Sequence, residues 1–162
     1  MRKITITKKD LDKDNYYKED GIGTYSEYEN VSVEIESNLG WVRFKNGIYV
    51  KGSVTALAGS GIEAGWGIKA GWGIEAGSGI TSLHSYIKSK LAITFNAKCT
   101  LSAGIFSISG EQEIEAQEIE GGKVIYGKVK FLPKEEKIKT PSLKGKEVEV
   151  KLDGVTYKAI IQ

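Results

Sequence analysis

The chain has 162 residues, which fits one domain or one domain with a small appendage. Its 23 basic and 21 acidic residues leave a net charge of +2, which argues against a polyanion mimic and against strong attraction to nucleic acid or membranes. A single cysteine, Cys99, excludes an internal disulfide and fits a reducing compartment. No apolar run approaches the roughly 20 residues of a membrane span, and the first residues lack the apolar core of a signal peptide. We therefore expect a cytoplasmic protein.

Residues 1–36 are predicted to form an N-terminal arm of capping strands. Val31, Val33 and Ile35 alternate with polar residues, which is typical of a half-buried strand. The turn at 37–40 then leads into a strand at 41–45. This strand opens the segment 37–131, for which we predict a β-solenoid with closing strands.

The middle of the chain repeats a pattern of six residues. From position 61 it reads Gly-Ile-Glu-Ala-Gly-Trp, Gly-Ile-Lys-Ala-Gly-Trp, Gly-Ile-Glu-Ala-Gly-Ser and Gly-Ile-Thr-Ser. In weaker form the register extends backwards, with Phe44, Val50 and Ala56 in the isoleucine position and Gly52 and Ala58 in the alanine position. Repeats of short period are the signature of stacked coils.

Each repeat predicts a three-residue strand followed by a three-residue corner. Side chains alternate along a strand, so isoleucine and alanine face an interior while Glu63, Lys69 and Glu75 face water. A helix is excluded because two glycines in every six residues would cost about 2 kcal/mol per repeat. A flexible linker would not keep isoleucine at a fixed period. The fold class is therefore all-β, a short β-solenoid in which Ile62, Ile68, Ile74 and Ile80 are all buried.

Further β-structure is predicted after the repeats. We expect strands at 91–95 and 100–108, an acidic strand at 111–120 and another strand at 123–131. Residues 132–144 are polar, contain the two prolines and mark a linker. Residues 145–162 form a hairpin with Asp153-Gly154 at its turn, and because a lone hairpin is marginal, it should dock on something.

Few residues in the chain could carry catalysis. His84 is the only histidine, and a histidine on the solenoid is the base of hexapeptide-repeat acyltransferases, but a partly exposed cap residue is the better interpretation. One histidine and one cysteine cannot supply a zinc site, and no Gly-Lys-Ser/Thr follows the glycine strings to make a phosphate loop. The acidic run at 111–120 is better explained as a solvated face than as a Ca²⁺ site. Cys99 is predicted to be a small core residue. We expect no enzyme, no cofactor and no metal.

The candidate binding residues lie on the repeats. Trp66 and Trp72 occupy corners between glycines, so they should protrude with Lys69 between them and with Glu63 and Glu75 beside them. Ser60 and Ser78 hold the equivalent corners in neighbouring repeats. The alternative is that the N-terminal arm covers both indoles with its tyrosines, Tyr16, Tyr17, Tyr25 and Tyr28.

The repeats resemble hexapeptide-repeat left-handed β-helices, which place three hexads in each coil. Those proteins carry their small inward residue two positions before the aliphatic one, whereas here Ala64, Ala70 and Ala76 follow two positions after it. The Gly-Ile-Glu-Ala-Gly-Trp string also resembles β-solenoid proteins of phages and prophages. That resemblance implies a non-enzymatic inhibitor of a host defence system, such as an anti-CRISPR protein that binds a host nuclease in the host cytoplasm.

Two other classes of function remain open. Solenoids have open ends that can stack, so the chain could be a structural or assembly protein, and for the same reason we expect a homo-oligomer. Tryptophan corners could also form a carbohydrate-binding module. Base stacking on single-stranded nucleic acid is a weaker alternative because of the acidic residues at 111–120.

Overall fold

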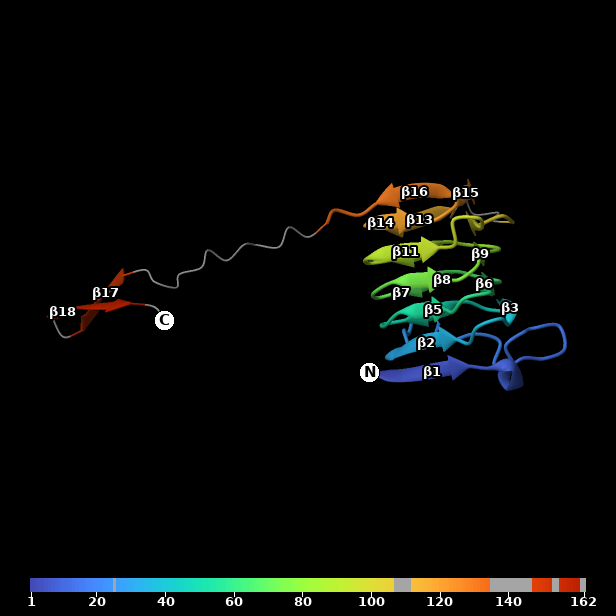
Figure 1. The fold of residues 1–162 in the computed structure, drawn as a ribbon, viewed down its shortest axis with the longest axis horizontal. Helices are drawn as coiled ribbons and strands as arrows, with labels where there is room; N and C mark the ends of the chain where they lie inside the picture. The colour runs from blue at the N-terminus through green and yellow to red at the C-terminus, as the bar shows by residue number, and fades with distance from the viewer. Residues whose placement is uncertain (25, 107–111, 135–146, 153–154, 161–162) are drawn as a thin grey trace.

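The fold is a stack of parallel coils, each built from three short strands (Figure 1). A computed structural model describes residues 1–24, 26–106, 112–134, 147–152 and 155–160, the last two ranges by their backbone only. In these residues sixteen strands form three parallel sheets, and two further strands pair with each other. The predicted all-β solenoid is confirmed.

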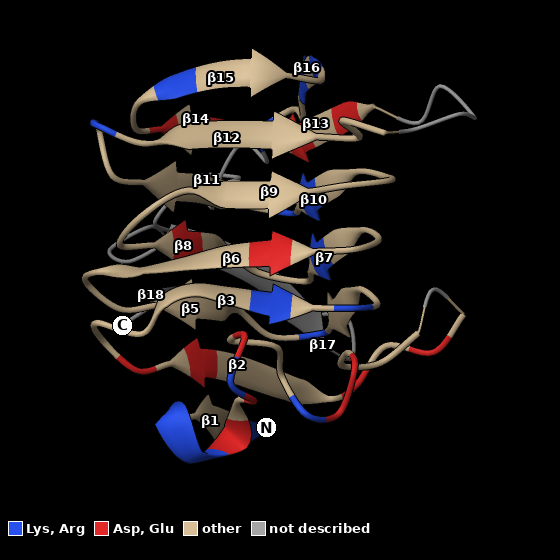
Figure 2. Cartoon of the chain, turned by 90° about the vertical axis from the view of Figure 1, so that its right-hand side faces the viewer, with Lys and Arg blue, Asp and Glu red and all other residues tan. Residues whose placement is uncertain are grey.

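The three sheets form the three sides of the stack (Figure 2). The first sheet contains β1 (Arg2–Ile6), β2 (Val31–Ile35), β5 (Val54–Ala56), β8 (Ile74–Ala76), β11 (Ala92–Phe95) and β14 (Glu118–Glu120). The second contains β3 (Gly40–Phe44), β6 (Ser60–Ala64), β9 (Ile80–Ser82), β12 (Thr100–Ala103) and β15 (Lys123–Tyr126). The third contains β4 (Ile48–Val50), β7 (Ile68–Ala70), β10 (Ile87–Ser89), β13 (Glu113–Ala116) and β16 (Lys128–Phe131). From β2 onward the chain visits the sheets in this order, so three strands complete one coil.

The isoleucines of the repeat form the core, as predicted. Ile62, Ile68, Ile74 and Ile80 are each at most 1% exposed. Each aligns with an aliphatic residue in a neighbouring coil, as Ile68 does with Ile48 on one side and Ile87 on the other. Strand pairing between coils therefore stacks aliphatic side chains into continuous columns.

The register predicted for the weaker repeats was wrong. Val42, Ile48 and Val54 occupy the isoleucine position, and Phe44, Val50 and Ala56 occupy the alanine position. Gly52 and Ala58 lie outside the strands. The physical reason is a longer corner between β5 and β6, where Val54 precedes Ile62 by eight positions in place of six. Gly59 supplies a positive φ of 76° in this corner, which glycine adopts without strain.

Strands after the repeats are shorter than predicted. From residue 112 on, the acidic run contains two strands, β13 and β14, with a corner at Gln117, and 123–131 likewise forms β15 and β16 with a corner at Gly127. The strand predicted at 100–108 ends as β12 at Ala103, because Gly104 has a φ of 68°. Residues 107 and 108 lie outside the described part. The repeat of short strand and corner thus continues beyond the recognisable hexads.

The N-terminal arm belongs partly to the solenoid and partly closes it. β1 and β2 pair with each other and continue the first sheet. Between them, the single-turn 3-10 helix η1 (Lys8–Asp10) begins with a capping box in which Thr7 and Asp10 bind each other's backbone. Leu11, Tyr17 and Ile22 follow and are buried at this end of the core, each at most 7% exposed.

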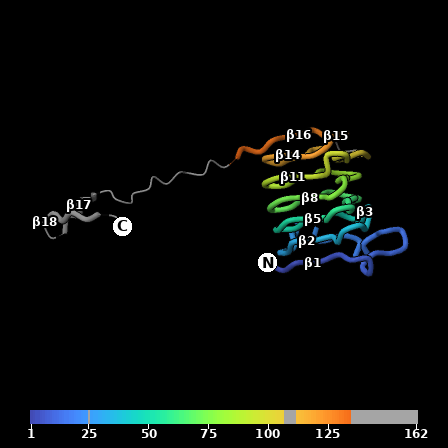
Figure 3. The backbone as a smooth tube through the Cα atoms, in the orientation of Figure 1, coloured from blue at the N-terminus to red at the C-terminus, as the bar shows by residue number. Residues whose placement is uncertain are grey.

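β17 (Glu147–Leu152) and β18 (Val155–Ile160) form an antiparallel pair, which confirms the predicted hairpin strands. The predicted turn at Asp153-Gly154 and most of the predicted linker at 132–144 lie outside the described residues, as do the side chains on which docking would depend. The backbone trace in Figure 3 shows the coils running from β1 at one end of the stack to β16 at the other.

Candidate binding site

The structure places Trp66 and Trp72 at the two ends of one short strand, β7. Trp66 lies in the corner between β6 and β7, Trp72 lies in the corner between β7 and β8, and each is 55% exposed. The described residues of the tyrosine-rich arm therefore leave both tryptophans exposed. Exposed aromatic side chains on a rigid support are typical of interfaces.

Close packing of the coils explains why the indoles point outward. A Cβ atom at Gly65 would collide with the carbonyl oxygen of Lys45, and one at Gly71 with that of Lys51. The backbone of each corner thus lies directly against the preceding coil, and no space remains beneath it for a large side chain. Trp41 behaves differently, because its ring lies against the backbone of Gly61 and Gly79 and is 38% exposed.

Trp66 belongs to a row of aromatic side chains along its corner. The ring of His84 lies 5.7 Å from the ring of Trp66 and 6.0 Å from that of Phe106, between centroids. His84 is exposed, and Phe106 is 61% exposed. Sequence reasoning missed Phe106 because it follows β12, outside the hexads. The row extends the apolar surface of Trp66 over three successive coils.

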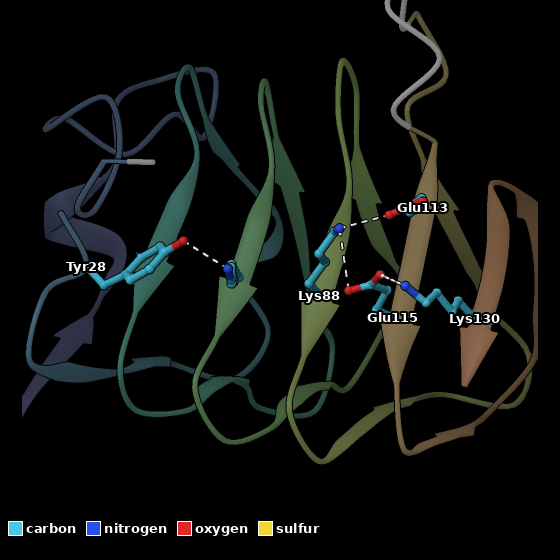
Figure 4. A network of polar contacts seen from close by, with 6 residues as sticks. Tyr28, Lys88, Glu113, Glu115 and Lys130 are labelled. Carbon is cyan, nitrogen blue, oxygen red and sulfur yellow. Dashed lines mark hydrogen bonds and ion pairs between the residues drawn. The ribbon is translucent and has the colours of Figure 1, made fainter. Parts of the chain in front are cut away.

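Trp72 forms one wall of a positively charged groove with a volume of about 350 Å³. The other side chains that we use to define this lysine groove are Tyr28, Lys51, Lys69 and Lys90. Lys69 donates a hydrogen bond of 2.9 Å to the hydroxyl of Tyr28, and its ammonium lies 4.9 Å from the ring centroid (Figure 4). This contact holds Lys69 against the tyrosine-rich arm without neutralising its charge.

The charges of the lysine groove are uncompensated within the described residues. No carboxylate from these residues lies within 4.0 Å of the ammonium groups of Lys51, Lys69 or Lys90. Lys88, which aligns with Lys69 one coil further on, is different: it binds Glu113 at 2.9 Å and Glu115 at 3.4 Å (Figure 4). The three lysines without such a partner therefore lie together beside Trp72.

The ion pairs of Lys88 shift the pKa values of Lys88 and Glu113. Partial burial alone would lower the pKa of Lys88, but its hydrogen bonds and ion pairs with Glu113 and Glu115 outweigh this and raise it. The hydrogen bond from Lys88 lowers the pKa of Glu113. Lys130 binds the other oxygen of Glu115 at 3.0 Å. The acidic residues of β13 thus serve the solenoid wall as partners of lysines in neighbouring coils.

Glu63 and Glu75, predicted to flank the tryptophans, lie on the other two sheets, on β6 and β8. Lys69 and Trp72 line the lysine groove, whereas Trp66 lines a separate hollow of about 470 Å³ together with Glu63, Lys45 and His84. Glu75 lines neither of these two hollows. The expectation that Glu63, Lys69 and Glu75 are all exposed was correct only for Glu75. Glu63 is half-buried because Arg43 binds it at 3.2 Å, and Lys69 is half-buried against Tyr28.

Ser60 does not hold a corner equivalent to the tryptophans. It begins β6 and is fully buried, where its hydroxyl donates to the carbonyl oxygen of Glu36 at 2.6 Å and accepts from the amide of Leu39 at 3.0 Å. The longer corner before β6 shifts Ser60 into the strand. Ser78 does lie in a corner, between β8 and β9, and is half-buried.

Other candidate chemistry is sparse in the described residues. None of them forms a group of three or more histidine, cysteine, aspartate or glutamate side chains suited to a metal ion. Cys99 is a free, half-buried thiol packed against the core. Within the same part of the chain, no helix has the length and hydropathy to span a membrane.

Comparisons with models of protein families, with curated proteins and with solved structures gave no match.

Proposed function

We propose that the chain is a non-catalytic binding protein that contacts a partner protein through Trp66, Lys69 and Trp72. The observation that carries the proposal is the pair of indoles, both 55% exposed, held at opposite ends of one strand. Rigid corners mean that little conformational entropy is lost when a partner covers the rings. Burial of one such indole can contribute about 2 kcal/mol or more to binding.

The lysine groove favours a partner with an acidic segment. Lys51, Lys69 and Lys90 supply positive charge without a carboxylate partner among the residues that the structure describes, and Trp72 offers an apolar wall beside them. Carboxylates of a partner would meet charges that need not first break an internal ion pair. We expect association to weaken as the salt concentration rises, because exposed charges are screened.

The nature of the partner is a finer proposal. The resemblance of the repeat string to phage β-solenoid proteins supports an inhibitor of a host defence system, with a CRISPR nuclease as the partner and the host cytoplasm as the location. This part of the proposal rests on the string alone and stays a prediction.

Replacement of both corner tryptophans with serine tests the proposal. Gly77-Ser78-Gly79 already forms a corner of this kind, so Trp66→Ser with Trp72→Ser should preserve the fold. Immobilised parent protein would capture its partner from host lysate, and calorimetry would then give the affinity of each variant for that partner. We expect the double variant to melt with the parent and to bind at least about tenfold more weakly, the loss of roughly 1.4 kcal/mol or more.

Leu57→Ser is the matched control. Leu57 is an apolar corner residue that is 40% exposed, but it lies in the corner between β5 and β6, away from β7. It should bind like the parent. Unchanged binding of the double tryptophan variant would contradict the proposal, and so would an equal loss in the control.

A further inference from the structure

The last coil of the solenoid is formed by β14, β15 and β16, and its core-facing side chains are half-buried in β14 and β15 and exposed in β16. By register, Val129 continues the column of Ile114 and Phe131 that of Ala116, both of which are fully buried. Val129 is nevertheless 40% exposed and Phe131 64% exposed. In the described part of the chain no further coil covers them, so the hydrophobic core opens to solvent at this end.

The same coil presents three strand edges. β14, β15 and β16 are each the terminal strand of their sheet and pair on one side only. Their outer N–H and C=O groups can therefore accept another strand. Ile125, 60% exposed, lies at a register shift in β15 and adds apolar surface to the middle edge. This terminal face combines unpaired backbone groups with apolar side chains.

Charges on the terminal face are separated by strand (Figure 2). β14 carries Glu118 and Glu120, whereas β16 carries Lys128 and Lys130. Two of these charges have partners within the chain, because Lys134 binds Glu118 at 3.1 Å and Lys130 binds Glu115 at 3.0 Å. If two copies met through this face, a two-fold axis across β15 would lay β14 of each copy along β16 of the other. An axis across β14 or β16 would instead set like charges against each other. Only one of the three arrangements is therefore electrostatically self-complementary.

We propose that the terminal face binds a second copy of this chain, through a two-fold axis that crosses β15. Facing strands then run antiparallel, because a two-fold axis perpendicular to the stack reverses the direction of each coil. Val129 and Phe131 of both copies become buried, and the three strand edges gain partners. This inference does not rest on the proposed function, because the face lies at the end of the solenoid and shares none of the residues of the β7 site.

The two-fold arrangement makes two specific pairings. Ile125 lies in the strand that the axis crosses, so the two copies of Ile125 lie near each other. Glu120 and Lys130 occupy equivalent outward-facing positions, because each directly follows a core-facing residue, Ile119 and Val129 respectively. The axis brings the middle of β14 opposite the middle of β16, so Glu120 of one copy faces Lys130 of the other.

Sedimentation equilibrium of the full chain, from about 1 to 100 μM, measures the association. We expect a dimer whose dissociation constant rises at least about tenfold in Phe131→Glu, since each copy would then bury an unpaired carboxylate. Leu57→Glu, which changes an exposed apolar residue in the corner between β5 and β6, should dimerise like the parent. A monomer at all these concentrations would overturn the proposal and would leave the face to residues 135–162 or to another protein. A dimer that Phe131→Glu leaves unchanged would also overturn it.

Two further variants test the axis itself. In a Cys99→Ser background, Ile125→Cys should give a disulfide-linked dimer on mild oxidation, and Leu57→Cys should not. Glu120→Lys should weaken the dimer, and addition of Lys130→Glu should restore part of the lost affinity by exchanging the charges. Lys130→Glu alone is the control, because it also breaks the ion pair with Glu115. Failure of the Ile125→Cys variant to cross-link, or a double charge reversal weaker than Glu120→Lys alone, would contradict an axis through β15.

Discussion

The two ends of the solenoid are built from the same kind of short strand but have different surfaces. At the N-terminal end Ile6, Leu11, Tyr17 and Ile22 are at most 7% exposed. At the other end Val129 and Phe131 occupy core-facing positions yet are 40% and 64% exposed. The difference lies in what adjoins each terminal coil, because residues 7–22 cover the first coil and no described residue covers the last.

Whether a core-facing side chain of a solenoid is buried therefore depends on the coils on either side of it. Ile68 and Val129 both follow the alternation of a half-buried strand, but only Ile68 has a coil on each side. The repeat alone therefore determines which way a side chain points, while the adjoining coil determines whether it meets protein or water.

Core truncations should give the largest contrast between the body and the open end. Ile68→Ala removes a fully buried side chain between two stacked isoleucines and should lower the free energy of unfolding by roughly 2–5 kcal/mol. Val129→Ala removes a side chain that is already 40% exposed and should cost about 1 kcal/mol or less. Urea denaturation of both variants, at protein concentrations low enough to keep the chain monomeric, measures the difference. Equal costs would contradict the open end, because they would require a cover over Val129.

Two single glycine substitutions, one on each side of Trp72, should show the next largest difference. A Cβ atom at Gly71 would collide with the backbone of Lys51, so Gly71→Ala should cost roughly 1–3 kcal/mol through forced backbone shifts. At Gly73 the nearest atom lies 3.6 Å away, an ordinary contact, so Gly73→Ala should stay within about 0.5 kcal/mol of the parent. Thermal denaturation compares the two. Similar melting of both variants would show that the coils do not pack as closely as described.

Loss of the cap at the closed end should have the smallest effect. Thr7→Ala removes the hydrogen bonds of the Thr7 hydroxyl, which donates to the Asp10 carboxylate at 2.8 Å and accepts from the Lys9 amide at 3.2 Å, and should cost about 1 kcal/mol. The pKa of Asp10 is lowered from its usual 3.8 first by the hydrogen bond from the Thr7 backbone N–H, which the variant keeps, and second by that from the Thr7 hydroxyl, which the variant loses. A carboxyl group whose pKa is lower in the folded than in the unfolded state stabilises the fold at pH values above its unfolded-state pKa. This contribution is lost as the pH falls through its folded-state pKa. The parent should therefore lose more stability than Thr7→Ala between about pH 5 and pH 3. Parallel acid titrations of the two proteins measure this difference, and an equal loss of stability in both would refute the expectation.

Sequence patterns predicted the body of the fold better than its corners and ends. Ile-x-Ala with glycine corners is nearly sufficient to define a coil, and all four repeat isoleucines are buried as expected. The backward register failed because the corner before β6 is two residues longer, and nothing in local composition sets the length of a corner. Burial of Ser60 followed from the same shift.

The candidate site could be predicted only in part. The glycines on either side of Trp66 and Trp72 indicated that the indoles protrude, and the structure places Lys69 between them as expected. Lys51, Lys90 and Phe106 come from neighbouring coils, so their proximity depends on the number of residues per coil. The same dependence explains why Glu63 and Glu75 lie on other sheets.

The most direct test of the account is the solvent exposure of the corner tryptophans, which requires no partner. Trp41→Phe leaves only Trp66 and Trp72 to emit, and Trp66→Ser with Trp72→Ser leaves only Trp41. Acrylamide should quench the first variant more strongly than the second, with a more red-shifted emission. The second variant should be less accessible, because Trp41 lies against the backbone of Gly61 and Gly79. Blue-shifted, protected emission from Trp66 and Trp72 would contradict the account, since covered indoles could not form the binding surface.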